Sequence, residues 1–338
     1  GSFSGTGGNN TISLALEVLP ADLEIALDLL KEALLQPAFA QSTFDTERES
    51  QIASLKEEDD EILDYGFRQL RQRFFGEHPF AIAADGRVED LESITVADIR
   101  AQYAKLVRAA NVVLSVSGDF DSQEMQAKLS DFLNTEINTE PFEVESIAGG
   151  VSPDAYDGHE HMDREQAVVL QAYPDSGIQE ADFVVSEMLN ELFSGMSSRL
   201  FERIREDQGM AYYVGSTRII GLNCGAFVFY AGTHPSHAEA VLTEINTEIA
   251  RVAAGEVTED ELARCRTRLK AARPMGKQTI GARAMHAAIQ VTYGLPIDDD
   301  AEHAAKLDSI NAAELARFAK QYLCESQRVQ LIVGPSDC

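Results

Sequence analysis

The chain has 338 residues, of which 44% are hydrophobic and 25% charged, as in ordinary globular proteins. Its 56 acidic residues outnumber 28 basic ones, giving a net charge of −28, and such a surface repels nucleic-acid phosphates and anionic lipid heads. No apolar run approaches the roughly 20 residues of a membrane helix. We therefore predict no nucleic-acid partner and no membrane span.

The acidic excess has two explanations. It would attract basic peptides, but a very soluble or halophilic surface is the simpler reading. The four cysteines have no CxxC spacing, which favours free thiols over a zinc knuckle or a disulfide framework. The first residues lack the basic and apolar regions of a signal peptide, so we expect a fragment or a processed product, whose compartment stays undetermined.

An internal repeat organises the chain. Residues Leu91–Ile99 read like Leu307–Leu315, at an offset of 216. Pro20 matches Pro235 at nearly the same offset. Several matches at one offset indicate a duplicated domain, and a length of 338 residues suits two domains of roughly 150 residues each.

The first copy predicts five elements in chain order. Alternating apolar residues indicate strands, and apolar residues at helical spacing indicate amphipathic helices. The elements are a strand at Thr11–Val18, a helix at Asp22–Leu35, a long helix at Asp45–Arg73, a helix from the cap Thr95 to Leu106, and a strand at Val112–Val116.

The second copy repeats this order from Ala226 to Val333. Three further elements precede it, namely a strand at Gln166–Tyr173 and helices at Glu180–Phe193 and Ser197–Asp207. We therefore predict an α+β protein of two homologous domains, each a mainly antiparallel sheet with helices packed on one face. The predicted domains are residues 1–133, lacking about 50 to 60 residues at the start, and 161–338, joined by a Glu-, Pro- and Gly-rich linker at 134–160.

Metal-ligand patterns are weak. No two of the seven histidines are four residues apart, so neither HExxH nor HxxEH exists. His159-Glu160-His161, with Asp157 or Asp163, can hold a metal weakly, but a solvated linker loop is the simpler interpretation. The acidic run Glu57–Glu61 lacks the spacing of a calcium loop and reads as a charged helix face.

The segment from Phe193 to Val214 is the richest in signals. Ser194-Gly195 ends one helix, Ser197 or Ser198 can cap the next, and Gly209 suits the left-handed position after a helix. On general grounds Arg205 would complement a helix dipole, and Tyr212 would be a half-buried strand residue.

This segment resembles the M16 family of insulinase-like zinc metallopeptidases, which includes insulin-degrading enzyme and mitochondrial processing peptidase. The resemblance covers nearly the whole chain, and its most specific part is the stretch from Gly195 to Tyr212. The matching motifs are Leu16-Glu-Val-Leu-Pro20, Leu55-Lys56 with Asp59-Asp60, Gly76-Glu-His-Pro-Phe80, Asp163-Arg-Glu-Gln-Ala-Val-Val169, Gly195-Met-Ser-Ser-Arg-Leu-Phe201 and Gly209-Met-Ala-Tyr212.

The resemblance implies a LuxS/MPP-like fold in which two halves enclose a substrate chamber. One half carries HxxEH and a third zinc ligand, Glu, on a later helix. The other half carries an Arg and a Tyr separated by six residues, the spacing of Arg205 and Tyr212 here. Their implied role is to donate hydrogen bonds to the substrate carbonyl or to the oxyanion formed there.

Two departures from the family pattern bear on catalysis. By the repeat, an HxxEH helix would fall before Gly1. The third-ligand position aligns with Ala53, flanked by Glu49 and Glu57, and an alanine cannot bind zinc.

The resemblance thus implies a non-catalytic half with no catalytic residue and no metal of its own, Arg205 and Tyr212 binding substrate. Zinc is expected in an HxxEH-bearing partner half, either on the same larger polypeptide or on a separate subunit. A peptide is the expected substrate. The alternatives are a truncated active peptidase, with Glu49 or Glu57 as a ligand, and a purely structural assembly subunit.

Overall fold

A computed structural model describes residues 1–136, 140 and 150–336. The chain forms two compact units, each built from several stretches of sequence. Unit 1 comprises Gly1–Leu55, Ala84–Ile147 and Met275–Ile297, and unit 2 comprises Lys56–Ala83, Ala148–Pro274 and Asp298–Cys338. No helix among the described residues is long and apolar enough to cross a membrane.

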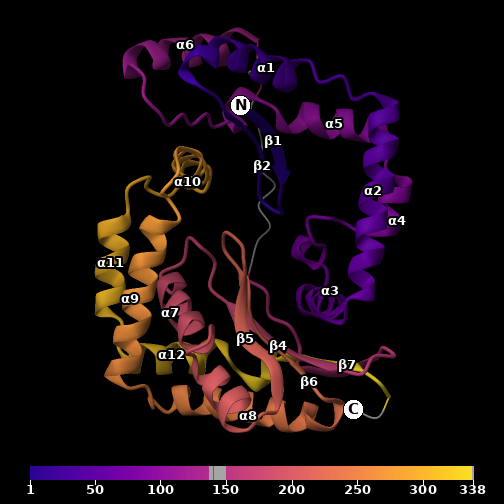
Figure 1. Cartoon of the computed structure of the whole chain (residues 1–338), viewed down its shortest axis with the longest axis vertical. Coiled ribbons are helices and arrows are strands. Elements are labelled where there is room, and N and C mark those ends of the chain that lie inside the picture. The colour runs from indigo at the N-terminus through magenta and orange to yellow at the C-terminus, as the bar shows by residue number, and fades with distance from the viewer. Residues whose placement is uncertain (137–139, 141–149, 337–338) are drawn as a thin grey trace. The chain divides into compact units, whose positions relative to one another are not determined.

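Unit 2 is built on a five-stranded mixed sheet of order β3-β7-β4-β6-β5 (Figure 1). Only β3 and β7 are parallel, and the other neighbours pair antiparallel. The strands are β3 (Tyr156–His161), β4 (Ala167–Asp175), β5 (Ala211–Ile220), β6 (Gly225–Thr233) and β7 (Val329–Gly334). The α+β class and the mainly antiparallel sheet are thereby confirmed.

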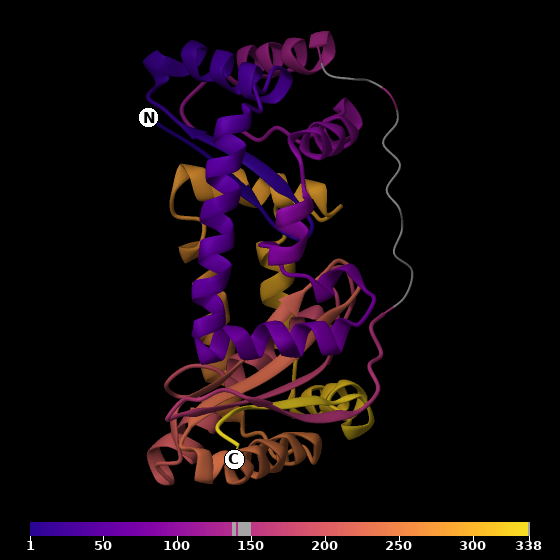
Figure 2. The ribbon, with the colours of Figure 1, turned by 90° about the vertical axis from the view of Figure 1, so that its right-hand side faces the viewer.

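Helices cover both faces of this sheet, and its central strand β4 is therefore buried along its whole length. Alternate side chains of β4 enter two apolar cores: Val169 and Tyr173 face one, Val168 and Leu170 the other. The first core contains α7 (Phe183–Phe193), α8 (Ala238–Ala253) and α12 (Ala312–Tyr322), and the second contains α3 (Ile62–Phe75). In Figure 2 the sheet lies between α3 and α8. The sequence predicted helices on one face of the sheet, and in unit 2 the helix α3 covers the other face as well.

The remaining elements of unit 2 surround the first core. A π-helical segment, Phe201–Asp207, leads from α7 to β5. The helix α9 (Glu259–Met275) follows α8, and α11 (Asp300–Ser309) packs against α7. These elements frame the candidate site described below.

Unit 1 is more open. Its two strands, β1 (Ser2–Gly7) and β2 (Ile12–Glu17), pair antiparallel. Both clusters of buried apolar side chains found among the described residues belong to unit 2, whereas unit 1 leaves Ile12 71% and Ile25 62% exposed. Its helices are α1 (Leu23–Leu35), α2 (Gln41–Asp60, which continues into unit 2), α4 (Val88–Ser93), α5 (Val96–Leu106), α6 (Ser122–Glu136) and α10 (Ile280–Thr292).

The repeat reappears in the order of elements. The helices α5 and α12 have the same length and begin 216 residues apart, at Val96 and Ala312. Each begins with a capping box, on Thr95 in one copy and Asn311 in the other. The strand pair β1–β2 of unit 1 is followed by α1, α2 and α3, and β5–β6 of unit 2 by α8, α9 and α10. In each copy the third of these helices belongs to the unit that does not contain the strand pair: α3 lies in unit 2 and α10 in unit 1. The sequence-based domain limits of 1–133 and 161–338 stay a prediction, and residues 137–139 and 141–149 of the linker lie outside the described part.

Two of the secondary-structure elements predicted from the sequence are wrong. The long helix Asp45–Arg73 is two helices, α2 and α3, because Glu61 between them is extended, with φ −89° and ψ 114°. Like charges four apart, as at Glu57 and Glu61, oppose a continuous helix. Within the described residues Val112–Val116 forms no strand, whereas its counterpart β7 pairs with β3 and β4.

The contact between α3 and the sheet depends on Gly66. A Cβ atom there would lie 2.7 Å from Leu170 Cδ1 and 3.3 Å from Val333 Cγ2. Gly66→Val should therefore lower the free energy of unfolding by about 1–3 kcal/mol through overpacking, as measured by chemical denaturation. The exposed substitution Asp64→Val on the same helix controls for side-chain type. Equal effects of the two substitutions would show that the close approach is unimportant.

Candidate functional site

The segment between α7 and β5 is fixed to the core of unit 2 at its start. Ser198 is buried, and its Oγ accepts a hydrogen bond from the Phe201 amide at 3.2 Å. Leu200 and Ile204 are fully buried in the core. The start of this helical segment is therefore set by a cap and two apolar anchors.

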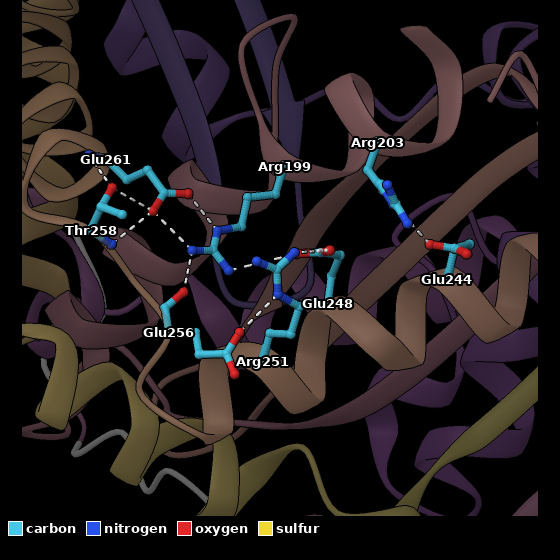
Figure 3. A network of polar contacts seen from close by, with 8 residues as sticks. All are labelled: Arg199, Arg203, Glu244, Glu248, Arg251, Glu256, Thr258 and Glu261. Carbon is cyan, nitrogen blue, oxygen red and sulfur yellow. Dashed lines mark hydrogen bonds and ion pairs between the residues drawn. The ribbon is translucent and has the colours of Figure 1, made fainter. Parts of the chain in front are cut away.

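Arg199 is the charged residue that ties this segment to two helices (Figure 3). Its Nε and Nη2 donate to the two carboxylate oxygens of Glu261 on α9, at 2.5 and 2.8 Å. Nη2 also donates to the Glu256 carbonyl, and Nη1 lies 3.6 Å from a Glu248 oxygen on α8. The side chain of Arg199 is only 11% exposed, so these partners balance a charge removed from water.

Glu261 is held as a carboxylate. Besides Arg199, it accepts hydrogen bonds from the Thr258 amide at 2.8 Å and the Thr258 hydroxyl at 2.7 Å, which caps α9. Burial alone opposes ionisation of Glu261, but the bonds from Arg199 and Thr258 outweigh it and lower the pKa to about 2.

The network continues along α8. Arg251 lies 2.9 Å from Glu248 and 3.0 Å from Glu256, and so links both to the Arg199 cluster. Arg203, on the π-helical segment, lies 3.3 Å from Glu244. Figure 3 shows these ion pairs joining Arg203 to α8, and Arg199, just before the π-helical segment, to α8 and α9.

Arg205 lies in the last turn of the same segment and is exposed. Its guanidinium carbon lies 4.8 Å from the centre of the Phe201 ring, in cation–π contact. Stacking on the ring leaves the N–H groups at the edges of the guanidinium plane free to donate.

A tight turn connects Arg205 to Tyr212. Gly209 has φ +63°, which a residue with a side chain rarely adopts. Its amide donates to the Arg205 carbonyl at 3.1 Å, and the Met210 carbonyl accepts from the Thr233 hydroxyl at 2.5 Å. The main chain on both sides of the turn is thereby fixed.

Tyr212 occupies a β-bulge at the start of β5. Ala211 pairs with Thr233 and Tyr213 with Gly232, which leaves Tyr212 without a partner across the strand. Ala211 faces the first core and Tyr213 faces Tyr230 on the opposite side of the sheet, at a ring distance of 6.3 Å. The bulge turns Tyr212 outward, where it is 52% exposed.

Arg205 and Tyr212 thus both present hydrogen-bond donors to solvent from a rigid frame. Within the described residues, no hydrogen bond joins them and Tyr212 has no polar partner. A guanidinium and a phenol on this frame can donate to a carbonyl or to a developing oxyanion.

The described residues offer no ligand set of the kind expected for zinc in this fold. Among them there is no group of three or more His, Cys, Asp or Glu able to hold a metal. Glu49, Ala53 and Glu57 lie exposed on α2. On α7, Glu187 contacts His303 at 2.6 Å and Glu191 contacts Arg268 at 2.7 Å.

Two other motifs have a structural explanation. The acidic run ends α2, where Arg68 contacts Glu58 at 3.1 Å and Asp59 at 2.6 Å. His159-Glu160-His161 is not a loop as predicted, because it forms the edge strand β3 beside β7.

Sequence reasoning missed the Arg199 network. Its acidic members, Glu248, Glu256 and Glu261, lie 49 to 62 residues away in the chain. One local signal was present, since Thr258 followed three residues later by Glu261 is the pattern of a capping box.

The comparisons agree with this fold. The family model described as the peptidase M16 inactive domain matches residues 93–269, about half of the chain. The chain therefore belongs to the peptidase M16 family, and the matched region includes both Arg205 and Tyr212.

Relatives carry names of the same kind. An uncharacterized zinc protease of Mycobacterium leprae is 27% identical over 72% of this chain and 56% of its own length. A probable inactive metalloprotease of Bacillus subtilis is 25% identical over 89% of this chain and 72% of its own length. The chain thus spans less than three fifths of the Mycobacterium protein. A crystal structure of a peptidase M16 inactive domain from Pseudomonas fluorescens shares the fold, with a TM-score of 0.89 and 21% identity over 99% of this chain and 81% of that chain.

The Arg199–Glu261 pair predicts a defined pH dependence. The carboxyl of Glu261 has a pKa of about 2 in the folded chain against an ordinary 4.5. Its contribution is therefore full above pH 4.5 and is lost as pH falls toward 2, because the unfolded chain takes up the proton first. Glu261→Gln should cost about 3 kcal/mol at pH 7, and the difference from the parent should shrink between pH 5 and pH 2, as measured by urea unfolding.

Glu259→Gln is the matched control on the same helix. Glu259 pairs with Arg266 at 2.5 Å but is 73% exposed, so its loss should cost less than about 1 kcal/mol. If Glu261→Gln costs no more than Glu259→Gln, the network does not hold the site.

Proposed function

We propose that this chain is the non-catalytic half of an M16 peptidase, which helps to enclose a peptide while a partner half carrying HxxEH and zinc cleaves it. Arg205 and Tyr212 are its substrate-binding residues. The partner half lies on the same larger polypeptide or on a separate subunit. This proposal joins the family membership to the placement of two side chains.

The exposure of Tyr212 is the observation that carries the proposal. On β5, Ala211 and Val214 are buried and Tyr213 is half-buried, and the bulge costs one ladder pairing. A tyrosine that stabilised the fold would be packed and hydrogen-bonded. A half-exposed phenol on a bulge is suited instead to contact a bound group.

Position at the sheet edge also supports a substrate role. Among the strands of the described residues, β5 pairs with β6 alone, so one edge of β5 has no paired strand there. Tyr212 and Arg205 lie at the start of this open edge, where an extended peptide can approach the main chain. The two donors would then point at carbonyl oxygens of that peptide.

The test is steady-state kinetics of the reconstituted pair. The full chain is combined with an HxxEH-bearing M16 protein of the same genome and a peptide library identifies a cleaved sequence. Tyr212→Phe should lower kcat/KM by on the order of a hundredfold, because it removes one donor to the reacting carbonyl. Arg205→Lys should act in the same direction, since an ammonium cannot reproduce the planar fork of donors.

Neighbouring residues supply the controls. Tyr213→Phe removes a hydroxyl from the next residue of β5, on another face of the sheet, and Arg203→Lys changes the arginine paired with Glu244. Both should retain activity within about threefold of the parent. Unchanged turnover in Tyr212→Phe would favour a purely structural subunit. Zinc-dependent cleavage by the isolated chain would contradict the proposal of a non-catalytic half.

A further inference from the structure

The histidines of β3 lie in a row on one face of the strand. Side chains along β3 alternate between half-buried and exposed, so that Asp157, His159 and His161 share the exposed face. Tyr156 and Glu160 lie on the other face, where Arg73 stacks on Tyr156 and pairs with Glu160. The two imidazoles therefore project from the same face of the strand.

This row is held in place from three sides. The strand β3 pairs with β7 along its whole length, in parallel register. Arg328 contacts Asp157 at 2.8 Å, and Arg73 contacts Glu160 at 2.8 Å. The strand geometry fixes the two histidine Cα atoms about 6.6 Å apart. A loop would not have kept that spacing.

The imidazole of His161 is also oriented. Its Nδ1 lies 2.9 Å from Ser336 Oγ. When Nδ1–H donates to this hydroxyl, Nε2 carries the lone pair and points away from the hydrogen bond. Histidines that bind metals are commonly oriented by such a second hydrogen bond. The His159 imidazole has no polar partner among the described residues, so its lone pair is available.

We propose that His159 and His161 chelate one divalent transition-metal ion, such as Cu²⁺ or Zn²⁺, on the exposed face of β3. Two imidazole nitrogens bind the ion and water fills its other positions. The net charge of −28 raises the local concentration of cations, whereas Asp157 at the end of the row is engaged by Arg328 at 2.8 Å. With two protein ligands, the ion exchanges readily. This site is independent of the peptidase chemistry proposed above.

A second histidine pair provides a comparison. The rings of His234 and His237 lie 5.9 Å apart, and His234 Nδ1 accepts from the Ser236 amide. This pair precedes α8, whose first residue is Ala238. The positive end of that helix opposes a bound cation. We therefore assign the metal to the pair on β3.

The experiment titrates Cu²⁺ into the full chain, purified without a polyhistidine tag, followed by calorimetry and electron paramagnetic resonance. We expect one ion per chain with two coordinated nitrogens. His159→Asn and His161→Asn should each weaken binding at least tenfold, and the double variant should lose little more, because either loss destroys the chelate. Ser336→Ala should weaken it several-fold. Unfolding midpoints without metal show that each variant is folded.

The double variant His234→Asn/His237→Asn is the matched control and should bind Cu²⁺ as the parent does. Additive losses for His159 and His161 would mean separate weak contacts and would refute the chelate. The proposal is also overturned if the β3 double variant binds normally or if the control variant alone abolishes binding.

Discussion

The buried guanidinium of Arg199 is the constraint on which the candidate site depends. A charge at 11% exposure costs several kcal/mol unless anions and carbonyls surround it, so Glu261 and Glu248 must stay where they are. These partners lie on α9 and α8, and they fix the start of the segment whose last turn carries Arg205. The position of Arg205 follows from this anchor, with Leu200 and Ile204 locking the rotation of the segment.

Corresponding apolar residues in the two copies of the repeat are buried to different extents. In the second copy Leu307 and Leu315 are fully buried, with α7 packed against α11 and α12. Their counterparts Leu91 and Ile99 are half-buried and line an apolar cavity of about 480 Å³ with Phe44. Within the described residues, the same sequence pattern therefore lies in a closed core in the second copy and lines a cavity in the first.

Local signals in the sequence predicted the elements that local chemistry determines. The cap at Thr95 and the helix that follows to Leu106 were correct, because a capping box and helical periodicity act within a few residues. The strand at Val112–Val116 was wrong, since a strand needs partners that no local pattern reveals. The loop predicted at His159 was also wrong. The polar residues there give no local strand pattern, but pairing with β7 stabilises a strand.

The candidate site was predictable only in part. Spacing and resemblance selected Arg205 and Tyr212, but two arginines six residues apart, Arg199 and Arg205, look alike in a sequence. Burial distinguishes the two arginines, because Arg199 is enclosed by carboxylates and Arg205 lies exposed over the Phe201 ring.

The most specific stretch of the chain therefore contains two kinds of residue. Ser198, Arg199 and Leu200 build the frame, and their loss would unfold or displace it. Arg205 and Tyr212 stabilise little by comparison, since both face solvent. The frame contains a buried ion pair, a left-handed glycine and a bulge, each of which has an energetic cost. It carries two exposed side chains, Arg205 and Tyr212, that contribute little to the stability of the fold. This contrast supports the proposal that Arg205 and Tyr212, rather than the frame, contact the substrate.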